Sequence, residues 1–341
     1  MRAMVLENVC DLSRERAPLR LADVPRPVPG EREVLVRVAA CGVCHTELDE
    51  IEGRTPPAFF PIIPGHQAVG RVEENGIGAH RFGPGDRVGV AWINSACGTC
   101  GFCRSGRENL CASFRATGRD AHGGYAEYLA VHEDFAHPIP SAFSDAEAAP
   151  LLCAGAIGYR SLALTGIRDG QTLGLSGFGG SAHLVLKMAA HRFPRTRVLV
   201  FARSVSEQAF ARELGAAWAG GHDGAPPEAC DAIMDTTPAW SPIVLALGNL
   251  KPGGRLVINA IRKEDADKDA LLCISYPEHL WMEKEVKSVA NVTRADVTEF
   301  LSLAAEIPIR PEVQLYPLEH ANEALMELKD GKVRGSKVLQ L

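Results

Sequence analysis

The sequence predicts an α/β protein of two domains, one rich in antiparallel strands and one with a doubly wound parallel sheet. Its 341 residues suffice for about two domains of ordinary size. The first ~150 residues carry short apolar runs broken by Gly and Pro, which is typical of antiparallel strands and their turns. Beyond about residue 153, apolar strands alternate with helical stretches, and this order indicates parallel strands joined by right-handed crossovers.

The individual elements follow from the same patterns. In the first segment, strands are expected where apolar residues recur between turn residues, at 33–38, 68–72 and 86–90. In the second, apolar runs predict strands at 172–176, 197–201, 231–235 and 254–260, with a helix over 181–190. The tail is expected to form helices over 294–306 and 319–329 and a last strand at 337–341.

The composition excludes several classes of protein. With 46% apolar and 23% charged residues, the chain is not disordered. The 36 Lys and Arg against 42 Asp and Glu leave a net charge of −6, whereas a dedicated nucleic-acid binder would be basic. No window approaches ~18 uninterrupted apolar residues, so no membrane span is expected.

The amino terminus and the cysteine content predict a cytoplasmic protein. Glu7, Asp11 and Arg14 interrupt the first residues before the apolar stretch of a signal peptide can form. Ten cysteines without such a signal indicate a reducing compartment, where clustered cysteines bind metal more often than they form disulfides.

The strongest local signal is the run Cys97-Gly-Thr-Cys100-Gly-Phe-Cys103, which Cys111 follows with the spacing C-x2-C-x2-C-x7-C. Two-residue gaps let successive thiolates turn onto one ion. Four sulfur ligands with no open position are typical of a structural, tetrahedral zinc. Four unrelated buried cysteines and an iron–sulfur cluster are alternatives; against the cluster, Cys111 lies far from the other three and no proline follows it.

A glycine-rich turn predicts a dinucleotide site. Ser176-Gly-Phe-Gly-Gly-Ser-Ala182 matches G-x-G-x-x-A, follows an expected strand and opens an expected helix. Gly177 allows the tight turn, Gly179 and Gly180 let the backbone approach the pyrophosphate, and Ala182 keeps the helix close to the sheet. The helix N-terminus adds backbone donors and the positive end of a dipole.

The end of the second strand of this unit favours NADP(H) over NAD(H). Val200-Phe-Ala-Arg203-Ser204 has no acid where an NAD site would hold the ribose hydroxyls. It offers a guanidinium, Arg203, and a hydroxyl, Ser204, which can accommodate a 2′-phosphate. A solvated loop arginine, and NAD(H) as the cofactor, are the alternatives.

Three further segments carry ligand-type side chains, and each is weak alone: Cys41-Gly-Val-Cys44-His45-Thr46, Pro64-Gly-His66-Gln67 and Pro150-Leu-Leu-Cys153-Ala-Gly. With the four-cysteine run and the glycine turn, this ordered set resembles the zinc-containing alcohol dehydrogenases of the medium-chain dehydrogenase/reductase superfamily. The resemblance covers essentially the whole chain.

The resemblance implies a catalytic zinc on Cys44, His66 and Cys153, with a fourth position left open. Because the family's ligand cysteine directly precedes a His/Arg and Thr/Ser pair, Cys44 is implied as the ligand and Cys41 is not. Thr46 is implied as the hydroxyl that hydrogen-bonds the alcohol oxygen.

Neighbouring positions carry further implied roles and some departures. His45 would contact the cofactor pyrophosphate, and Glu47 would support the ligand histidine where the family has aspartate. Gln67 stands where the family usually has glutamate, which removes a negative charge beside the metal. Asp49 stands where many members carry the histidine that ends the proton relay, and it is expected to be an exposed carboxylate. Ser336 falls where many have a cofactor-binding arginine, for which Lys337 or Arg334 could substitute.

The resemblance implies a GroES-like catalytic domain of residues 1–153 and 290–341, with a zinc lobe at about 95–113, and a Rossmann domain of residues 154–289. It also implies two zinc ions per chain, a homodimer or homotetramer, and oxidation of an alcohol or reduction of an aldehyde, with hydride transfer to or from a nicotinamide cofactor.

Two alternatives remain open at this point. One is another zinc-dependent activity of the same superfamily, such as polyol or formaldehyde oxidation. The other is a non-enzymatic zinc protein whose lobe binds a partner, but such a protein has no need of Cys44, His66, Cys153 and a dinucleotide turn together. A count of two zinc ions per chain would favour the dehydrogenase.

Overall fold

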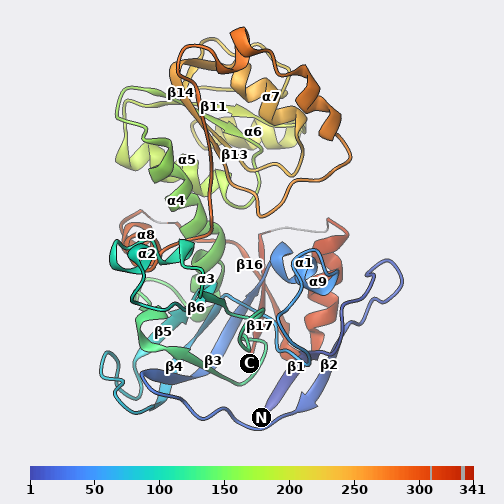
Figure 1. Cartoon of the computed structure of the whole chain (residues 1–341), viewed down its shortest axis with the longest axis vertical. Coiled ribbons are helices and arrows are strands. Elements are labelled where there is room, and N and C mark those ends of the chain that lie inside the picture. Colours follow the sequence, from blue (N-terminus) through green and yellow to red (C-terminus); the bar gives the residue numbers. More distant parts are fainter. Residues whose placement is uncertain (308, 332–334) are drawn as a thin grey trace. The chain divides into compact units, whose positions relative to one another are not determined.

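The computed structural model describes residues 1–307, 309–331 and 335–341. The chain divides into two compact units: unit 1 is Met1–Ala156 with Val292–Leu341, and unit 2 is Ile157–Asn291 (Figure 1). Within the described residues, no helix is long and apolar enough to cross a membrane.

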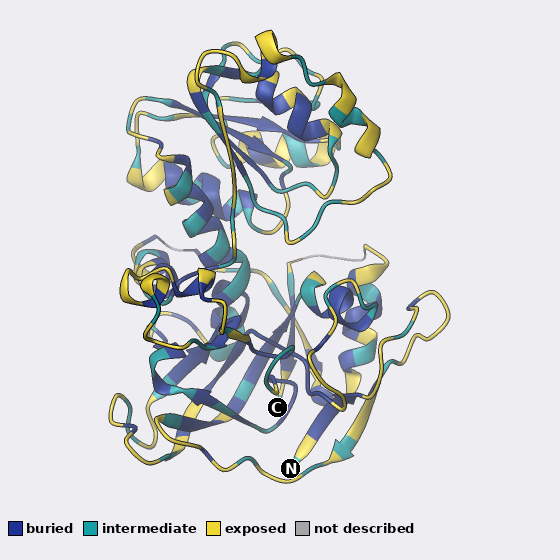
Figure 2. Ribbon diagram, in the orientation of Figure 1, coloured by how far each residue is buried: buried dark blue, intermediate teal, exposed yellow. Residues whose placement is uncertain are grey.

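Unit 1 is built around a mostly antiparallel sheet of strand order β16-β17-β3-β4-β5-β9, with β8 also paired to β3. Its strands are β3 (Glu33–Val43), β4 (Ala68–Asn75), β5 (Arg87–Val90), β8 (Tyr128–His132), β9 (Ala136–Pro138), β16 (Val313–Pro317) and β17 (Ser336–Gln340). Two small sheets pair β1 (Arg2–Leu6) with β2 (Leu19–Asp23), and β6 (Ile93–Ser95) with β7 (Arg115–Ala116). The strand residues are largely buried in one apolar core (Figure 2).

The helices of unit 1 lie beside this sheet. They are α1 (His45–Ile51), α2 (Gly101–Arg104), α3 (Asp145–Pro150), α8 (Arg294–Glu306) and α9 (Ala321–Lys329). Short 3₁₀ turns lie at Glu108–Leu110, Glu133–Phe135 and Leu318–His320, and a π-helical turn at Leu151–Gly155 leads from α3 into α4 (Ala156–Thr165).

Unit 2 holds a parallel sheet of six strands in the order β12-β11-β10-β13-β14-β15. Its strands are β10 (Thr172–Ser176), β11 (Arg197–Phe201), β12 (Trp218–Gly220), β13 (Cys230–Asp235), β14 (Leu250–Ile258) and β15 (Glu285–Ser288). Its helices are α5 (Ala182–Arg192), α6 (Val205–Glu213) and α7 (Ser241–Gly248), with short turns at Lys268–Cys273 and Tyr276–Leu280. This strand order is that of the doubly wound dinucleotide-binding fold, and the direction of winding reverses between β10 and β13. The predicted fold class is confirmed.

Two of the differences from the predicted bounds follow from strand pairing. The strand expected at 33–38 continues to Val43, because β4 pairs with it as far as Cys41 and β17 pairs with it as far as Val43. The strand expected from residue 254 begins four residues earlier, at Leu250. Its pairing with β13 skips from Leu250 to Arg255, so the Pro-Gly-Gly segment forms a bulge inside the strand instead of a turn before it.

Candidate active site

Three ligand-type side chains from distant parts of unit 1 converge. Cys44 follows β3 and caps α1, His66 precedes β4, and Cys153 lies in the π-helical turn after α3. One ligand atom from each of the three lies within 4.8 Å of the others. The backbone before His66 depends on glycine: Gly65 has φ +100°, and a Cβ there would lie 2.4 Å from the Tyr125 ring.

The Glu47 carboxylate holds two of these residues in place. Its Oε2 accepts the backbone N–H of Cys44 at 2.8 Å, which closes the first turn of α1. Its Oε1 lies 2.6 Å from His66 Nδ1, and both side chains are fully buried. With Nδ1 engaged by a carboxylate, Nε2 of His66 is the ring nitrogen left for a metal.

The electrostatics of the group suit a cation. The sulfurs of Cys44 and Cys153 are 3.9 Å apart, and a shared proton lowers the pKa of Cys44 well below its ordinary value while it raises that of Cys153. Burial lowers the pKa of His66, but the Glu47 carboxylate and Cys44 outweigh it, and the net pKa is raised. A divalent cation would take the place of these protons, since metal ligands must be deprotonated.

The other residues expected at this site lie around the three ligands. The Thr46 hydroxyl oxygen is 3.6 Å from the Cys44 sulfur. His45 is exposed at the start of α1. Gln67 is buried, and its side chain lies against Gly42, where a Cβ would be 2.7 Å from Gln67 Oε1. Cys41 is buried outside the ligand group, and burial raises its pKa well above the ordinary value.

The expectation that Asp49 is exposed is wrong. The sequence suggests an exposed carboxylate, but Asp49 lies on the inner side of α1 with 5% exposure. Its Oδ1 accepts a hydrogen bond from Arg54 Nε at 2.5 Å. Arg54, which is itself exposed, also donates to Glu52. A buried carboxylate paired with an arginine, and not a solvated group, therefore occupies the place of the family's relay histidine.

Sequence reasoning missed Glu50. Its carboxyl is 2% exposed, and neither oxygen has a hydrogen-bond partner among the described residues. Burial, and then the charge of Glu47, raise its pKa well above the ordinary value. A sequence signal for Glu50 exists: it lies three residues after Glu47, a spacing that places both carboxyls on one side of a helix.

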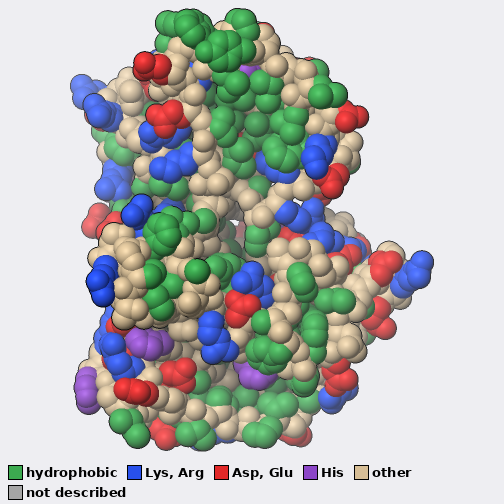
Figure 3. Space-filling view, viewed as in Figure 1, with side chains coloured by type: hydrophobic (Ala, Val, Ile, Leu, Met, Phe, Trp, Pro, Cys, Tyr) green, Lys and Arg blue, Asp and Glu red, His purple; other side chains and the backbone are tan. Residues whose placement is uncertain are grey.

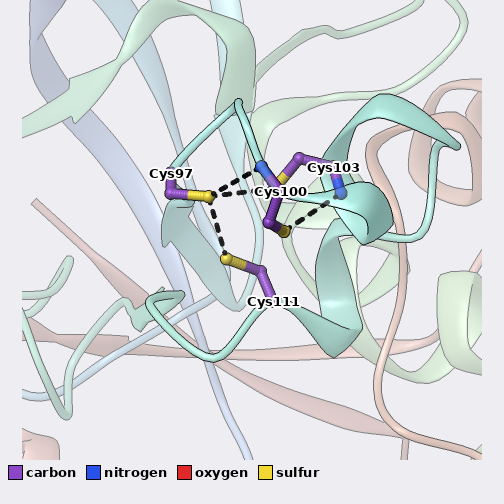
Figure 4. Close-up of side chains that lie close together, drawn as sticks. All are labelled: Cys97, Cys100, Cys103 and Cys111. Carbon is purple, nitrogen blue, oxygen red and sulfur yellow. Dashed lines mark hydrogen bonds between the residues drawn. The ribbon is translucent and has the colours of Figure 1, made fainter.

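The four cysteines of the lobe form a second ligand group. Cys97 follows β6, Cys100 caps α2, Cys103 lies on α2 and Cys111 follows the turn Glu108–Leu110. Their sulfurs point toward one another (Figure 4) and lie within 4.8 Å. The pKa of Cys97 is lowered to about 6, mainly because its sulfur accepts the backbone N–H of Cys100.

In unit 2 the glycine turn connects β10 to α5, at the point where the sheet reverses its winding. Gly177 has φ +82°, and a Cβ there would lie 2.6 Å from the Thr236 hydroxyl. The positions of Gly179 and Gly180 are open, because nothing within 4 Å would contact a side chain added there. Ala182 is fully buried at the start of α5.

Of the two residues expected to hold a 2′-phosphate, only one has a side chain that is not already hydrogen-bonded within the described residues. Arg203 is exposed directly after the β11 strand and forms no ion pair with the described residues. Ser204 caps α6, where its hydroxyl donates to Glu207 Oε2 at 2.9 Å and accepts the Glu207 N–H. The Glu207 carboxylate is therefore used in this capping box and is not a free acid at the end of β11.

Lys337 does not replace the arginine that many relatives carry near the carboxyl terminus. It is 2% exposed, and its Nζ contacts Glu327 Oε2 at 2.5 Å and Tyr316 Oη at 2.7 Å. The ammonium group of Lys337 is thus paired within unit 1. Arg334, the other substitute considered, lies outside the described residues.

Comparison with known proteins agrees with this geometry. Residues 30–141 match the family described as the alcohol dehydrogenase GroES-like domain. A GroES-like domain with a Cys–His–Cys group and a four-cysteine lobe, in one chain with a doubly wound dinucleotide sheet, defines a medium-chain dehydrogenase of the zinc-containing type.

Whole-chain relatives make the assignment more specific. The chain is 44% identical over 321 residues to the probable alcohol dehydrogenase AdhA of Mycobacterium tuberculosis, covering 93% of this chain and 90% of that one. It is 33% identical to an alcohol dehydrogenase of Geobacillus stearothermophilus over the full length of both. The structure of the cobalt- and zinc-bound alcohol dehydrogenase of Pyrobaculum aerophilum matches with a TM-score of 0.85, at 25% identity, over 100% of this chain and 99% of that one. The chain belongs to the zinc-containing alcohol dehydrogenase family.

Proposed function

We propose that this alcohol dehydrogenase depends on a zinc ion held by Cys44, His66 and Cys153, and that a second, structural zinc occupies the four-cysteine lobe. The observation that carries the proposal is the convergence of two sulfurs and one imidazole within 4.8 Å. Sulfur and imidazole are ligands that zinc prefers, and three protein ligands leave one position for substrate. When bound there, zinc supplies a Lewis acid for the alcohol oxygen.

The neighbouring side chains then have defined tasks. Glu47 fixes the ring of His66 and the backbone of Cys44, so two ligands keep their orientation through one carboxylate. The Thr46 hydroxyl, 3.6 Å from the Cys44 sulfur, is the group we assign to accept a hydrogen bond from the substrate's hydroxyl and to pass that proton on toward solvent. Because Asp49 is paired with Arg54, we do not assign it the last step of proton release.

We assign the cofactor NADP(H), bound at the glycine turn of unit 2. Support comes from Arg203, a cation that is exposed and unpaired within the described residues, and from the use of Glu207 in a helix cap. A ribose 2′-phosphate would complete the pairing of this guanidinium, whereas NAD(H) would need an acid at the same place. Ser204 contributes less, because its hydroxyl already serves the cap.

Replacing Arg203 with alanine should raise the Michaelis constant for NADP(H) by about ten- to a hundredfold, which corresponds to a charge-assisted contact of about 1.5–3 kcal/mol. The constant for NAD(H) should change little, since NAD(H) has no 2′-phosphate. Initial rates with both cofactors measure this, with Arg212→Ala, in the last turn of the following helix α6, as the control. An equal effect on both cofactors would contradict the assignment.

The proposal as a whole is tested by a panel of primary, secondary and aromatic alcohols, each assayed with both cofactors, together with elemental analysis of the purified chain. We expect oxidation of at least one class with NADP⁺ and two zinc ions per chain. Removal of the catalytic zinc by a chelator should abolish turnover, and added Zn²⁺ should restore it. Full activity in a metal-free chain would refute the zinc dependence.

We also propose a homo-oligomer, a dimer or a tetramer, assembled through β15. This strand ends the described sheet of unit 2, and all four of its residues are exposed. Exposed apolar side chains lie close by in sequence, among them Trp281 at 55% and Met282 at 53%. Hydrophobic side chains also gather on the face of unit 2 seen in Figure 3. A second copy would cover such an edge, and sedimentation of the purified chain measures its mass.

The cysteines support a reducing location, for which we propose the cytoplasm. All ten are free thiols, and seven of them belong to the two ligand groups. An oxidising compartment would turn such clustered thiols into disulfides and destroy both sites.

A further inference from the structure

A buried ion pair lies at the carboxyl edge of the parallel sheet in unit 2. Asp235 is the last residue of β13 and is fully buried, and the Lys263 side chain, from the loop after β14, is 7% exposed. Lys263 Nζ donates to Asp235 Oδ2 at 2.6 Å and to the backbone carbonyls of Thr237 at 2.7 Å and Ala239 at 3.0 Å. The three protons of the ammonium group are therefore all used inside the protein.

This pair holds the loop of residues 236–240, and that loop lies directly against the glycine turn. The Thr236 backbone N–H and hydroxyl both donate to the carbonyl of Ser176, at 2.8 Å and 3.1 Å. Gly177 follows Ser176, and its missing side chain leaves room for the Thr236 hydroxyl, 2.6 Å from where a Cβ would be. The first glycine of the turn is thus packed on a loop that Lys263 ties down.

The same carboxylate also fixes the strand that leads into the turn. Asp235 Oδ1 accepts hydrogen bonds from the Ser176 hydroxyl at 2.8 Å and the Thr237 hydroxyl at 2.9 Å. Ser176 Oγ in turn lies 3.5 Å from Nδ1 of His222, which follows β12. The buried polar network connects segments after β12, β10, β13 and β14, the sheet edge at which such folds bind dinucleotides.

The negative charge of Asp235 explains why a cation, Lys263, pairs with it. A carboxylate buried at the start of the pyrophosphate-binding turn would repel the pyrophosphate, and a low-dielectric surrounding would screen that repulsion poorly. Lys263 neutralises Asp235 and fixes the loop with its other two bonds. Neither residue touches the open positions at Gly179 and Gly180, so the pair acts through the turn.

We propose that Lys263 is a positioning residue for dinucleotide binding, which it supports by neutralising Asp235 and by clamping the 236–240 loop under the glycine turn. This inference rests on the proposed function, because it assumes that unit 2 binds a nicotinamide dinucleotide. Lys263 does not belong to the glycine fingerprint and lies 28 positions after Asp235.

Direct titration of the full-length chain with NADP(H) and NAD(H), by calorimetry, tests the proposal. Lys263→Met should raise the dissociation constant by about tenfold or more, the scale of one lost charge-assisted bond. Lys251→Met is the matched control: Lys251 pairs with Asp231 at 2.7 Å, near the opposite end of the same strand β13. That variant should change the dissociation constant by less than about twofold, as substitutions away from a site do.

Charge neutralisation and loop clamping are separated by two more variants. The pair Asp235→Asn with Lys263→Met removes the uncompensated charge and keeps an acceptor for Ser176. Thermal stability and the affinity lost to charge repulsion should therefore return, while the affinity lost with the bonds to Thr237 and Ala239 should not. Lys263→Arg, which keeps the charge, should recover part of the affinity. If Lys263→Met fails to fold, these two variants carry the test.

Each result of these titrations decides for or against the inference. If Lys251→Met weakens binding as much as Lys263→Met, the pair is structural only and the inference is overturned. A double variant that binds dinucleotide as tightly as the wild type would refute the clamp, and one that binds as weakly as Lys263→Met would refute the neutralisation; either result overturns the proposal as stated. Equal binding by the wild type and Lys263→Met overturns it as well, and leaves the proposed function intact. A wild-type chain that binds neither dinucleotide would refute the proposed function itself.

Discussion

Replacing Cys153 with serine should abolish alcohol oxidation and leave a folded protein with one zinc in place of two. Cys153 contributes one of only two sulfurs to the Cys44–His66–Cys153 group. Serine places a weakly acidic hydroxyl where a thiolate is needed, so metal affinity falls. We expect turnover to drop by about a thousandfold or more, equivalent to about 4 kcal/mol in the barrier.

Zinc analysis and circular dichroism of the variant measure both parts of this prediction. Cys41→Ser is the control, because Cys41 is another free cysteine of unit 1 that is buried and belongs to neither ligand group. It should keep two zinc ions and most of the activity. A Cys153→Ser enzyme with near-normal turnover, or a Cys41→Ser enzyme that loses the catalytic zinc, would show that the ligands are assigned wrongly.

The second large effect is expected in the lobe, where Cys100→Ser should lower stability far more than it lowers the rate per folded molecule. The lobe has little core of its own: α2 has four residues, and only Cys103 of them is buried. Its folding energy must come largely from the metal. Loss of about 3 kcal/mol or more would lower the melting temperature by about 6–12 °C in a unit of this size.

Cys100 is the informative position because it also caps α2, where its side chain accepts the N–H of Cys103. Serine is itself a favoured cap, so the substitution removes a metal ligand without removing the cap. Calorimetric melting with and without a chelator measures the effect. Cys273→Ser, at an exposed thiol outside both groups, should melt like the wild type. An unchanged melting temperature for Cys100→Ser would argue against a metal in the lobe.

The sequence predicts well those features that depend on local spacing. The strands β10 and β11 begin and end at the predicted residues, because a parallel strand buried on both faces is a short continuous apolar run. The four-cysteine group likewise follows from its spacing. The Cys44–His66–Cys153 group needed the family resemblance, because its members come from three separate segments.

The wrong expectations all concern partners that are distant in sequence or hidden by packing. Asp49 is buried on α1 and pairs with Arg54, and the sequence pattern at the start of a helix predicts neither. Lys337 is held by Glu327 and Tyr316 in a neighbouring helix and strand. Lys263 carried no motif at all, and its importance appears only when the loops after β13 and β14 meet.

The pairing of β17 with β3 has a consequence for the synthesis of the chain. Val43, directly before the proposed ligand Cys44, pairs with Lys337, which lies 294 positions later (337 − 43 = 294). At ~5–20 residues per second, a ribosome needs about 15–60 s to supply that partner strand. Unit 2 is continuous from Ile157 to Asn291, so it emerges complete while β3 still has an unpaired edge. A chain that stops before residue 336 would keep this edge open and expose it to aggregation, and Cys44 would lack the strand that pairs with the residue before it.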